Sequence, residues 1–177
     1  RIQDVALELF AEQGYEKTSL REIAERLEVT KAALYYHFKT KEEIIVGIFT
    51  DLTKPIEDLI DWGKSQPHTL ETKQELVRRY SQALSEATPL FRFMQENQAT
   101  VRELQIGDSF KDRTRSLRDI IIDPDAPLTD QVRCVSAIFT LHAGMFFLQD
   151  LEGDPEDKRA AVLEVAVDLV TQAHQGA

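Results

Sequence analysis

Apolar side chains recur with helical spacing along nearly the whole chain, and this repeat leaves few folds open to it. Residues such as Leu20, Ile23, Ala24 and Leu27 recur at steps of three and four, which places them on one face of an α-helix. No stretch has the alternation of a half-buried strand, and no internal repeat is present. With only 7 glycines and 6 prolines in 177 residues, the chain is also poor in turn residues. The pattern predicts an all-α protein of about nine helices.

Capping residues mark where the first helices begin. Ser19 opens a capping box with the glutamate three residues later, and Thr40 has the same spacing to a glutamate. Thr30 is placed to cap the short helix between these two. The helix after Thr40 extends to about residue 62, and Pro55 predicts a kink inside it. Three short helices therefore end by about residue 47, where a long helix carries the chain onward.

The remainder of the chain, residues 48–177, is also helical in pattern. The loops that we expect contain Pro67, then Asp123 to Pro127, and then Gly153. The expected helices cover residues 70–88, 89–122, 129–150 and 155–174, the second of them broken near Gln98 or at 106–109. The sequence thus divides into an N-terminal domain, residues 1–47, and a larger helical domain, residues 48–177.

The net charge is unevenly distributed. Thirty-one acidic and 21 basic side chains give −10, and a uniform object of that charge would repel nucleic acid. Residues 1–47 carry only −2, whereas residues 48–177 carry −8. Within the first part, residues 29–41 contain no acidic side chain and three lysines, Lys31, Lys39 and Lys41. This window lies on two short helices joined by a tight turn, an arrangement that places the second helix in the DNA major groove. Solvated lysines on an ordinary helix pair are the alternative.

Several other classes of protein are disfavoured. The single cysteine, Cys134, allows no intrachain disulfide, which favours the cytoplasm and a buried thiol over a redox sensor. The longest uncharged run, residues 134–149, is shorter than the roughly 20 residues of a membrane span, so we expect no membrane partner. No signal peptide is visible, and because Arg1 already lies inside an amphipathic pattern we expect residues upstream of it.

Enzyme chemistry has no signature in this sequence. There is no His-Glu-x-x-His, no glycine-rich phosphate loop, no Gly-x-Ser-x-Gly and no pair of metal-binding cysteines. The four histidines are scattered, and the many carboxylates lie on exposed helix faces. We therefore expect no catalytic residues, no metal and no cofactor, and a protein that is not an enzyme.

Specific residues in the first quarter of the chain resemble a known family. These are Ser19-Leu-Arg-Glu-Ile-Ala24, Val29-Thr30 and Leu34-Tyr-Tyr-His-Phe38-Lys-Thr-Lys41-Glu-Glu, together with Ala6, Phe10 and Gly14. They resemble the N-terminal domain of the tetracycline-repressor (TetR) family of ligand-responsive transcription regulators. Beyond residue 47 the likeness is one of helix number, length and order. The resemblance implies a homodimeric repressor that binds a pseudo-palindromic double-stranded DNA operator and is released by a small, largely apolar effector.

The resemblance also implies roles for individual residues. Lys31, Ala32 and Ala33 would face the floor of the major groove, and Arg21 would reach a base. Phosphate contacts are expected from Ser19, Thr30, Tyr35, Tyr36, His37 and Lys41. Leu34 and Phe38 are expected in the core. One departure is Glu28, at a turn position where the family often has glycine, so that a positive φ there would carry a steric cost.

The resemblance places the dimer interface on the last two long helices, and their composition agrees. Small and branched side chains there would allow close contact in an intersubunit four-helix bundle. The interface candidates are Met145, Val162, Val165, Ala166, Leu169, Val170 and Ala173. The alternative is that one of these helices forms only the core of a single chain.

Aromatic side chains in the second part of the sequence are candidates for an effector pocket between helices. The candidates are six aromatic residues, one methionine and one histidine: Trp62, Tyr80, Phe91, Met94, Phe110, Phe139, His142 and Phe146. The alternative for each is ordinary core packing, and for His142 an interior or interface position rather than a metal site. Two other functions stay open: a regulator without an effector, and a helical adaptor or enzyme that kept the fold but lost DNA binding.

Overall fold

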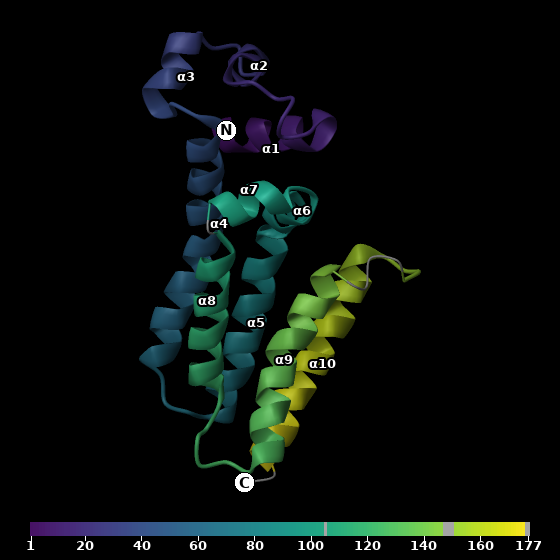
Figure 1. The fold of residues 1–177 in the computed structure, drawn as a ribbon. Helices are drawn as coiled ribbons and strands as arrows, with labels where there is room; N and C mark the ends of the chain where they lie inside the picture. Colours follow the sequence, from purple (N-terminus) through teal and green to yellow (C-terminus); the bar gives the residue numbers. More distant parts are fainter. Residues whose placement is uncertain (105, 147–150, 176–177) are drawn as a thin grey trace. The chain divides into compact units, whose positions relative to one another are not determined.

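A computed structural model of the chain describes residues 1–104, 106–146 and 151–175. Within these ranges every regular element is a helix, which confirms the prediction of an all-α fold (Figure 1). The helices are α1 (Ile2–Gln13), α2 (Leu20–Arg26), α3 (Lys31–His37), α4 (Lys41–Lys64), α5 (Leu70–Glu86), α6 (Thr88–Glu96), α7 (Gln98–Glu103), α8 (Ile106–Ile121), α9 (Leu128–Phe146) and α10 (Pro155–Gln175).

The described part of the chain contains ten helices rather than nine because the segment after residue 88 is broken twice. Asn97 adopts φ −126° and ψ 48°, which ends α6 before α7 begins. A second break precedes Ile106, where α8 starts. Both sites were candidates for a single break, and the structure uses both.

The predicted caps at the first helices are present. The Glu22 amide donates to Ser19 Oγ at 3.2 Å, and the Ser19 amide donates to the Glu22 carboxylate at 2.7 Å, which completes a capping box. Thr30 Oγ1 accepts a bond from the Ala33 amide at 3.1 Å. The box expected at the start of α4 is only half formed, because the Glu43 carboxylate accepts from the Lys39 amide, one residue earlier than expected.

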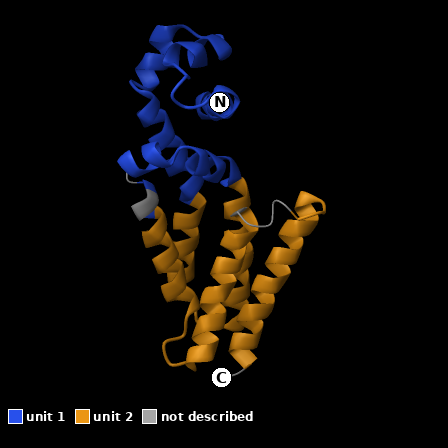
Figure 2. Cartoon of the chain, turned by 45° about the vertical axis from the view of Figure 1, so that its right-hand side comes forward, with its two compact units in different colours: residues 1–54, 87–109 blue, residues 55–86, 110–177 orange. Residues whose placement is uncertain are grey.

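The contacts within the chain define two compact units (Figure 2). Unit 1 contains residues 1–54 and 87–109, and unit 2 contains residues 55–86 and 110–177. Helix α4 contributes to both, and the division falls between Lys54 and Pro55. The units are defined by packing, so the functional division at residue 47 stays a prediction.

Unit 1 is larger than the first three helices because α6 packs against α1. Three aromatic rings join them: the centroid of Phe93 lies 5.7 Å from that of Phe10 and 5.6 Å from that of Tyr15. Phe10 and Tyr15 are themselves 5.0 Å apart in an edge-to-face arrangement. All three side chains are buried, so Phe93 is part of the core that supports the predicted DNA-binding helices.

Unit 2 is built around α9, which packs along α10, and both helices contact α5 (Figure 1). The two helices pack tightly at Gly144, where an added Cβ would lie 2.9 Å from a methyl group of Val162. Among the described residues, no helix combines the length and the apolar character needed to cross a membrane.

Candidate nucleic-acid interface

Helices α2 and α3 are short, and buried apolar side chains hold them in place. Leu20, Ile23 and Ala24 bury one side of α2, while Leu34, 1% exposed, is the buried anchor of α3. The turn between them is closed by a bond from the Val29 amide to the Ala24 carbonyl at 3.0 Å. The opposite side of α3 is left free to meet a partner.

The turn between α2 and α3 has the positive φ at Glu28 that the sequence analysis considered. Glu28 has φ 56°, in the left-handed region, where a side chain is costly and glycine is not. No other non-glycine residue in the described ranges has a positive φ. The turn therefore keeps its geometry and accepts the strain.

The outer surface of α3 presents most of the residues predicted to contact DNA. Lys31, Ala32, Ala33, Tyr36 and His37 are all exposed, and Tyr36 is 81% exposed. A tyrosine ring with so little burial gains little from folding, so its position suits contact with another molecule.

Two further residues of α3 and its cap are placed differently. Tyr35 is half-buried and packs against the core of unit 1, and the Lys31 ammonium lies 5.2 Å from the centre of its ring. Thr30 is exposed, but its hydroxyl already accepts the Ala33 amide in the cap. The predicted contacts of these residues with DNA stay predictions.

The other two lysines of the basic window are bound to backbone carbonyls. Lys39 Nζ donates to the Tyr35 carbonyl at 2.6 Å, which closes the end of α3. Lys41 Nζ donates to the Tyr15 carbonyl at 2.7 Å and lies 4.3 Å above the centre of the Tyr15 ring. Carbonyl groups carry no net charge, so both ammonium groups keep their positive charge for a phosphate. The contact between Lys41 and Tyr15 could not be predicted from the sequence, because the two residues are far apart in the chain and no local pattern connects them.

Two predicted contacts on α2 have partners within the chain. Arg21 Nε donates to Glu25 at 2.7 Å, and both side chains are largely exposed, so solvent weakens this pair and a phosphate can replace the carboxylate. Ser19 Oγ donates to the Glu22 carboxylate at 2.7 Å besides capping α2. Hydrogen bonds from the Ser19 side chain and backbone lower the pKa of Glu22. A phosphate contact from Ser19 would compete with this bond, and it stays a prediction.

Four of the eight pocket candidates come together in unit 2. Tyr80 Oη lies 2.6 Å from His142 Nε2, and both side chains are buried. The rings of Phe110 and Phe139 have their centroids 5.3 and 5.8 Å from that of His142. Burial lowers the pKa of His142 to about 4 and raises that of Tyr80, so the pair is uncharged at neutral pH.

The other four candidates are placed elsewhere or not described. Trp62 is half-buried in unit 2, where the Arg79 guanidinium stacks 4.3 Å from the centre of its ring. Phe91 is buried in unit 1, and Met94 packs against the core of that unit. The side chain of Phe146 lies outside the described part of the structure.

The interface candidates divide into buried and exposed groups. Val162, Ala166, Val170 and Ala173 are already buried within one chain, so they offer little surface to a second one. Val165 is 51% exposed, while Leu169 and Met145 are half-buried.

Helix α9 carries exposed apolar side chains of its own. Leu128, Val132 and Phe139 are 75%, 55% and 57% exposed. Their spacings of four and seven residues place them on one face of α9. This face was only partly predicted, because Phe139 was expected at the dimer contact as well as at the pocket, whereas Leu128 and Val132 were predicted at neither. No cluster of metal-binding side chains occurs among the described residues.

Comparison with known proteins shows what the first part of the chain resembles. Residues 2–48 match the family described as "Bacterial regulatory proteins, tetR family". The chain is 38% identical over 72 residues to the A-factor receptor protein of Streptomyces griseus, which is 36% of this chain and 26% of that protein. It is 50% identical over 48 residues to the HTH-type transcriptional regulator AcrR of Shigella flexneri, which is 27% of this chain and 22% of that protein. The chain thus spans only about a quarter of the length of these relatives.

A longer match reaches beyond the first three helices. The HTH-type transcriptional repressor KstR2 of Rhodococcus jostii is 30% identical over 121 residues, which is 59% of each chain. AcrR and KstR2 are named as a transcriptional regulator and a transcriptional repressor, which supports the prediction that the chain is not an enzyme.

Solved structures share the whole fold. The TetR-family regulator PfmR from Thermus thermophilus aligns over 95% of this chain and 97% of its own, with a TM-score of 0.68 and 23% identity. AmtR of Mycobacterium smegmatis aligns over 98% and 91%, with a TM-score of 0.65 and 19% identity. At these identities the likeness shows the helical fold and nothing more.

Proposed function

We propose that the chain is a DNA-binding repressor of the tetR family that acts as a homodimer on a pseudo-palindromic operator, a proposal supported by the match of residues 2–48 to the model of that family. The observation that carries this proposal is the exposed outer face of α3, where Lys31, Ala32, Ala33 and Tyr36 stand free above the buried anchor Leu34. The cytoplasm, where bacterial DNA lies, is the proposed location.

In this proposal α3 enters the major groove. The small side chains of Ala32 and Ala33 let the helix approach the bases, where a methyl contact with thymine and a lysine bond to guanine supply direct readout. Lys41, Tyr36 and His37 bind phosphates, and the remaining selectivity comes from the shape of the DNA.

The dimer forms through α9 and α10. The exposed face of Leu128, Val132 and Phe139, with Val165 on α10, supplies the apolar surface that such an interface needs. Two recognition helices would then meet half-sites about 34–36 Å apart, or a multiple of that distance.

The effector binds in unit 2 near the uncharged pair of Tyr80 and His142. Aromatic rings around this pair suit an apolar molecule with one hydrogen-bonding group. Binding would change the geometry of α4, with Pro55 as the point of bending, because a proline removes one backbone bond from the helix. The effector must bind the non-operator conformation more tightly, since equal affinity for both would shift nothing. A compound that co-purifies with the protein in native mass spectrometry would separate this mechanism from a regulator without an effector.

A random-site selection with the full chain tests the central proposal. We expect enrichment of an inverted repeat, bound by a dimer with an affinity that falls steeply as salt rises. Binding without sequence preference, or no binding at low salt, would overturn the proposal and favour the adaptor alternative.

A further inference from the structure

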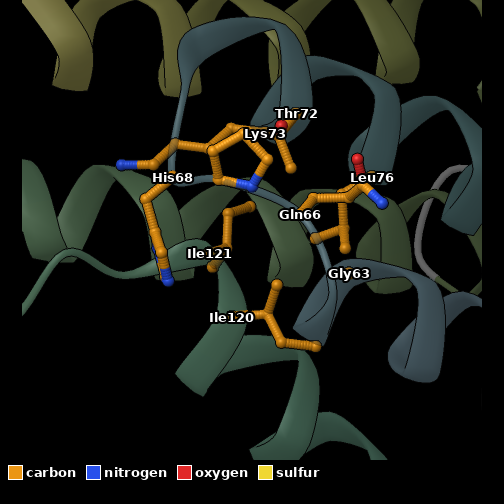
Figure 3. A pocket seen from close by; sticks show the side chains of 9 residues that line it. Gly63, Gln66, His68, Thr72, Lys73, Leu76, Ile120 and Ile121 are labelled. Carbon is orange, nitrogen blue, oxygen red and sulfur yellow. The ribbon is translucent and has the colours of Figure 1, made fainter.

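Lys73 and Lys41 both lie against the protein, but in different settings. Lys73 lines a hollow of unit 2 beside Leu76 and Ile120 (Figure 3), whose side chains leave no room for a ligand. Lys41 lies in unit 1, where it is the first residue of α4 and is half-buried. A positive side chain in the first turn of a helix is unfavourable, because the helix dipole is positive there. The position of Lys41 therefore depends on contacts from outside its own helix.

Tyr15 supplies two of these contacts. Its main-chain carbonyl accepts a hydrogen bond from Lys41 Nζ at 2.7 Å, and the same ammonium lies 4.3 Å from the centre of its ring. A cation above the face of an aromatic ring is attracted by the negative potential of that face. One residue, 26 positions earlier in the chain, thus holds the ammonium from two sides.

The Tyr15 ring is itself fixed within the core of unit 1. It is buried and meets the rings of Phe10 and Phe93 edge to face, at centroid distances of 5.0 and 5.6 Å. Its hydroxyl donates to the Glu42 carboxylate at 2.9 Å. Burial raises the pKa of Tyr15, and the bond to Glu42 raises it further, so the hydroxyl stays protonated. The surface that receives Lys41 is therefore held in one place.

The Lys41 ammonium keeps capacity for a further partner. Of its three N–H donors, the Tyr15 carbonyl and ring account for two, and the third has only a long contact of 3.4 Å with the Glu16 carbonyl. This contact is exposed and longer than an ordinary hydrogen bond, so a phosphate oxygen can replace it. Hydrogen bonds from Ser19 lower the pKa of Glu22, and the charge of Lys41 lowers it further. The ammonium thus lies near the start of α2, where Ser19 is also predicted to contact a phosphate.

We propose that Tyr15 is a positioning residue for DNA binding, because its ring and carbonyl hold the Lys41 ammonium where it meets a DNA phosphate. The inference rests on the proposed function, in which Lys41 binds a phosphate. A free lysine side chain loses rotamer freedom when it binds a partner, whereas Lys41 has already lost much of that freedom on folding. Tyr15 therefore strengthens binding to DNA of every sequence without touching the DNA itself.

A double-mutant cycle tests this role on a fluorescein-labelled duplex that carries the inverted repeat recovered in the random-site selection. Tyr15→Leu removes the ring beneath Lys41 but keeps an apolar side chain in the core. In fluorescence anisotropy we expect it to weaken binding about threefold, the size of a cation–π contact. We expect no further weakening when Lys41→Ala is already present. No weakening by Tyr15→Leu, or equal weakening in both backgrounds, would overturn the proposal, since Tyr15 would then act through the core alone or not at all.

Two matched variants separate the ring from its surroundings. Tyr15→Phe keeps the ring and loses only the bond to Glu42, so it should bind like the wild type; a loss as large as that of Tyr15→Leu would overturn the role of the ring. Phe93→Leu removes a buried ring from the same cluster and should weaken binding equally with and without Lys41. If its effect depended on Lys41 as strongly as that of Tyr15→Leu, loosening of the core would explain both, and the proposal would fail.

A measurement on the wild type decides the question if Tyr15→Leu does not fold. Protons above the face of an aromatic ring resonate upfield, so the ε-methylene signals of Lys41, assigned by their loss in Lys41→Ala, should be shifted upfield and stay shifted when the duplex binds. Ordinary shifts in the free protein, or a return to them on binding, would overturn the proposal. A wild type that binds no duplex would instead overturn the proposed function, and this inference with it.

Discussion

Glu28 shows how a single backbone angle limits the stability of the predicted DNA-binding turn. Its φ of 56° costs about 1–2 kcal/mol for a residue with a side chain. Glycine avoids this cost but loses more entropy on folding, about 0.4–1 kcal/mol. We expect Glu28→Gly to raise the free energy of unfolding by about 0.5–1 kcal/mol in urea denaturation.

The control for this prediction is Glu28→Ala, which removes the charge but keeps the strained φ. It should change stability by less than about 0.5 kcal/mol, as exposed substitutions usually do. Equal stabilisation by alanine and glycine would mean that charge, and not backbone strain, limits the turn.

Lys31 and Lys41 should behave differently although both are lysines of the basic window. Lys31 is exposed and has no partner in the described part of the chain beyond the Tyr35 ring, so Lys31→Ala should leave stability within about 0.5 kcal/mol. It should relax base preference at one position per half-site, at a cost of about 1–3 kcal/mol. A selected operator motif identical to that of the wild type would contradict this role.

Lys41→Ala should act on both stability and binding. Because the ammonium bonds the Tyr15 carbonyl at 2.7 Å, its loss should lower the free energy of unfolding by about 1 kcal/mol. It should also weaken binding about equally to all DNA sequences and reduce the salt dependence by about one phosphate contact. Fluorescence anisotropy at several salt concentrations measures this, and a change in base preference would refute the phosphate role.

His142 makes stability depend on pH in a defined direction. Burial lowers its pKa from the ordinary 6.5 to about 4, so between these values the unfolded chain binds a proton that the folded chain does not. Stability from this group is complete above pH 6.5 and is lost as the pH falls toward 4. We expect the wild type to lose about 1 kcal/mol more than His142→Gln between pH 7.5 and 5.5. Parallel stability profiles of the two proteins would contradict a buried, neutral histidine.

At the scale of helices, local signals in the sequence were reliable and long-range contacts were not. Ser19 and Thr30 cap their helices as predicted, because a cap involves only residues within one turn. The packing of Phe93 against Phe10 joins residues more than 80 positions apart, and no local pattern encodes such a pairing. For the same reason Met94 was assigned to a pocket, whereas it packs against the core of unit 1.

The contact of α9 with α10 depends on the absence of a side chain at Gly144. A Cβ there would lie 2.9 and 3.0 Å from the two methyl groups of Val162, whose branched side chain has little freedom to move. Overpacking costs about 1–3 kcal/mol, and the gain in helix propensity offsets about 1 kcal/mol of this. We expect Gly144→Ala to lower the free energy of unfolding by about 1 kcal/mol.

A double variant tests the cause of this effect. In the Val162→Ala background the methyl groups are gone, so adding Gly144→Ala should be neutral or stabilising. If Gly144→Ala costs the same in both backgrounds, the strain arises elsewhere.

For the whole molecule, the sequence predicted the exposed surface of α3 better than the surfaces of unit 2. The exposed residues of α3 could be inferred from the two residues predicted to face the core, of which Leu34 is buried and Phe38 is half-buried. In unit 2, the helices are apolar on nearly all sides, so the sequence alone does not indicate which side is buried within the chain and which is exposed. Val162 and Ala166 were candidates for an interface but are buried in one chain, while Leu128 and Val132 were not candidates but are exposed.

In the proposed dimer, operator affinity depends on the contact surface of unit 2. Two N-terminal DNA-binding domains joined in one dimer bind an operator far more tightly than a single one does. Val132 is 55% exposed on α9, so Val132→Glu should leave the single chain folded while placing a charge in the apolar contact. We expect a monomer in sedimentation and an operator affinity lowered by at least about tenfold, although every predicted DNA contact is intact. Leu151→Glu is the matched control, since Leu151 is 57% exposed but lies outside the helices. A Val132→Glu protein that stays dimeric would place the interface on another face, whereas a monomer with unchanged operator affinity would show that one head suffices.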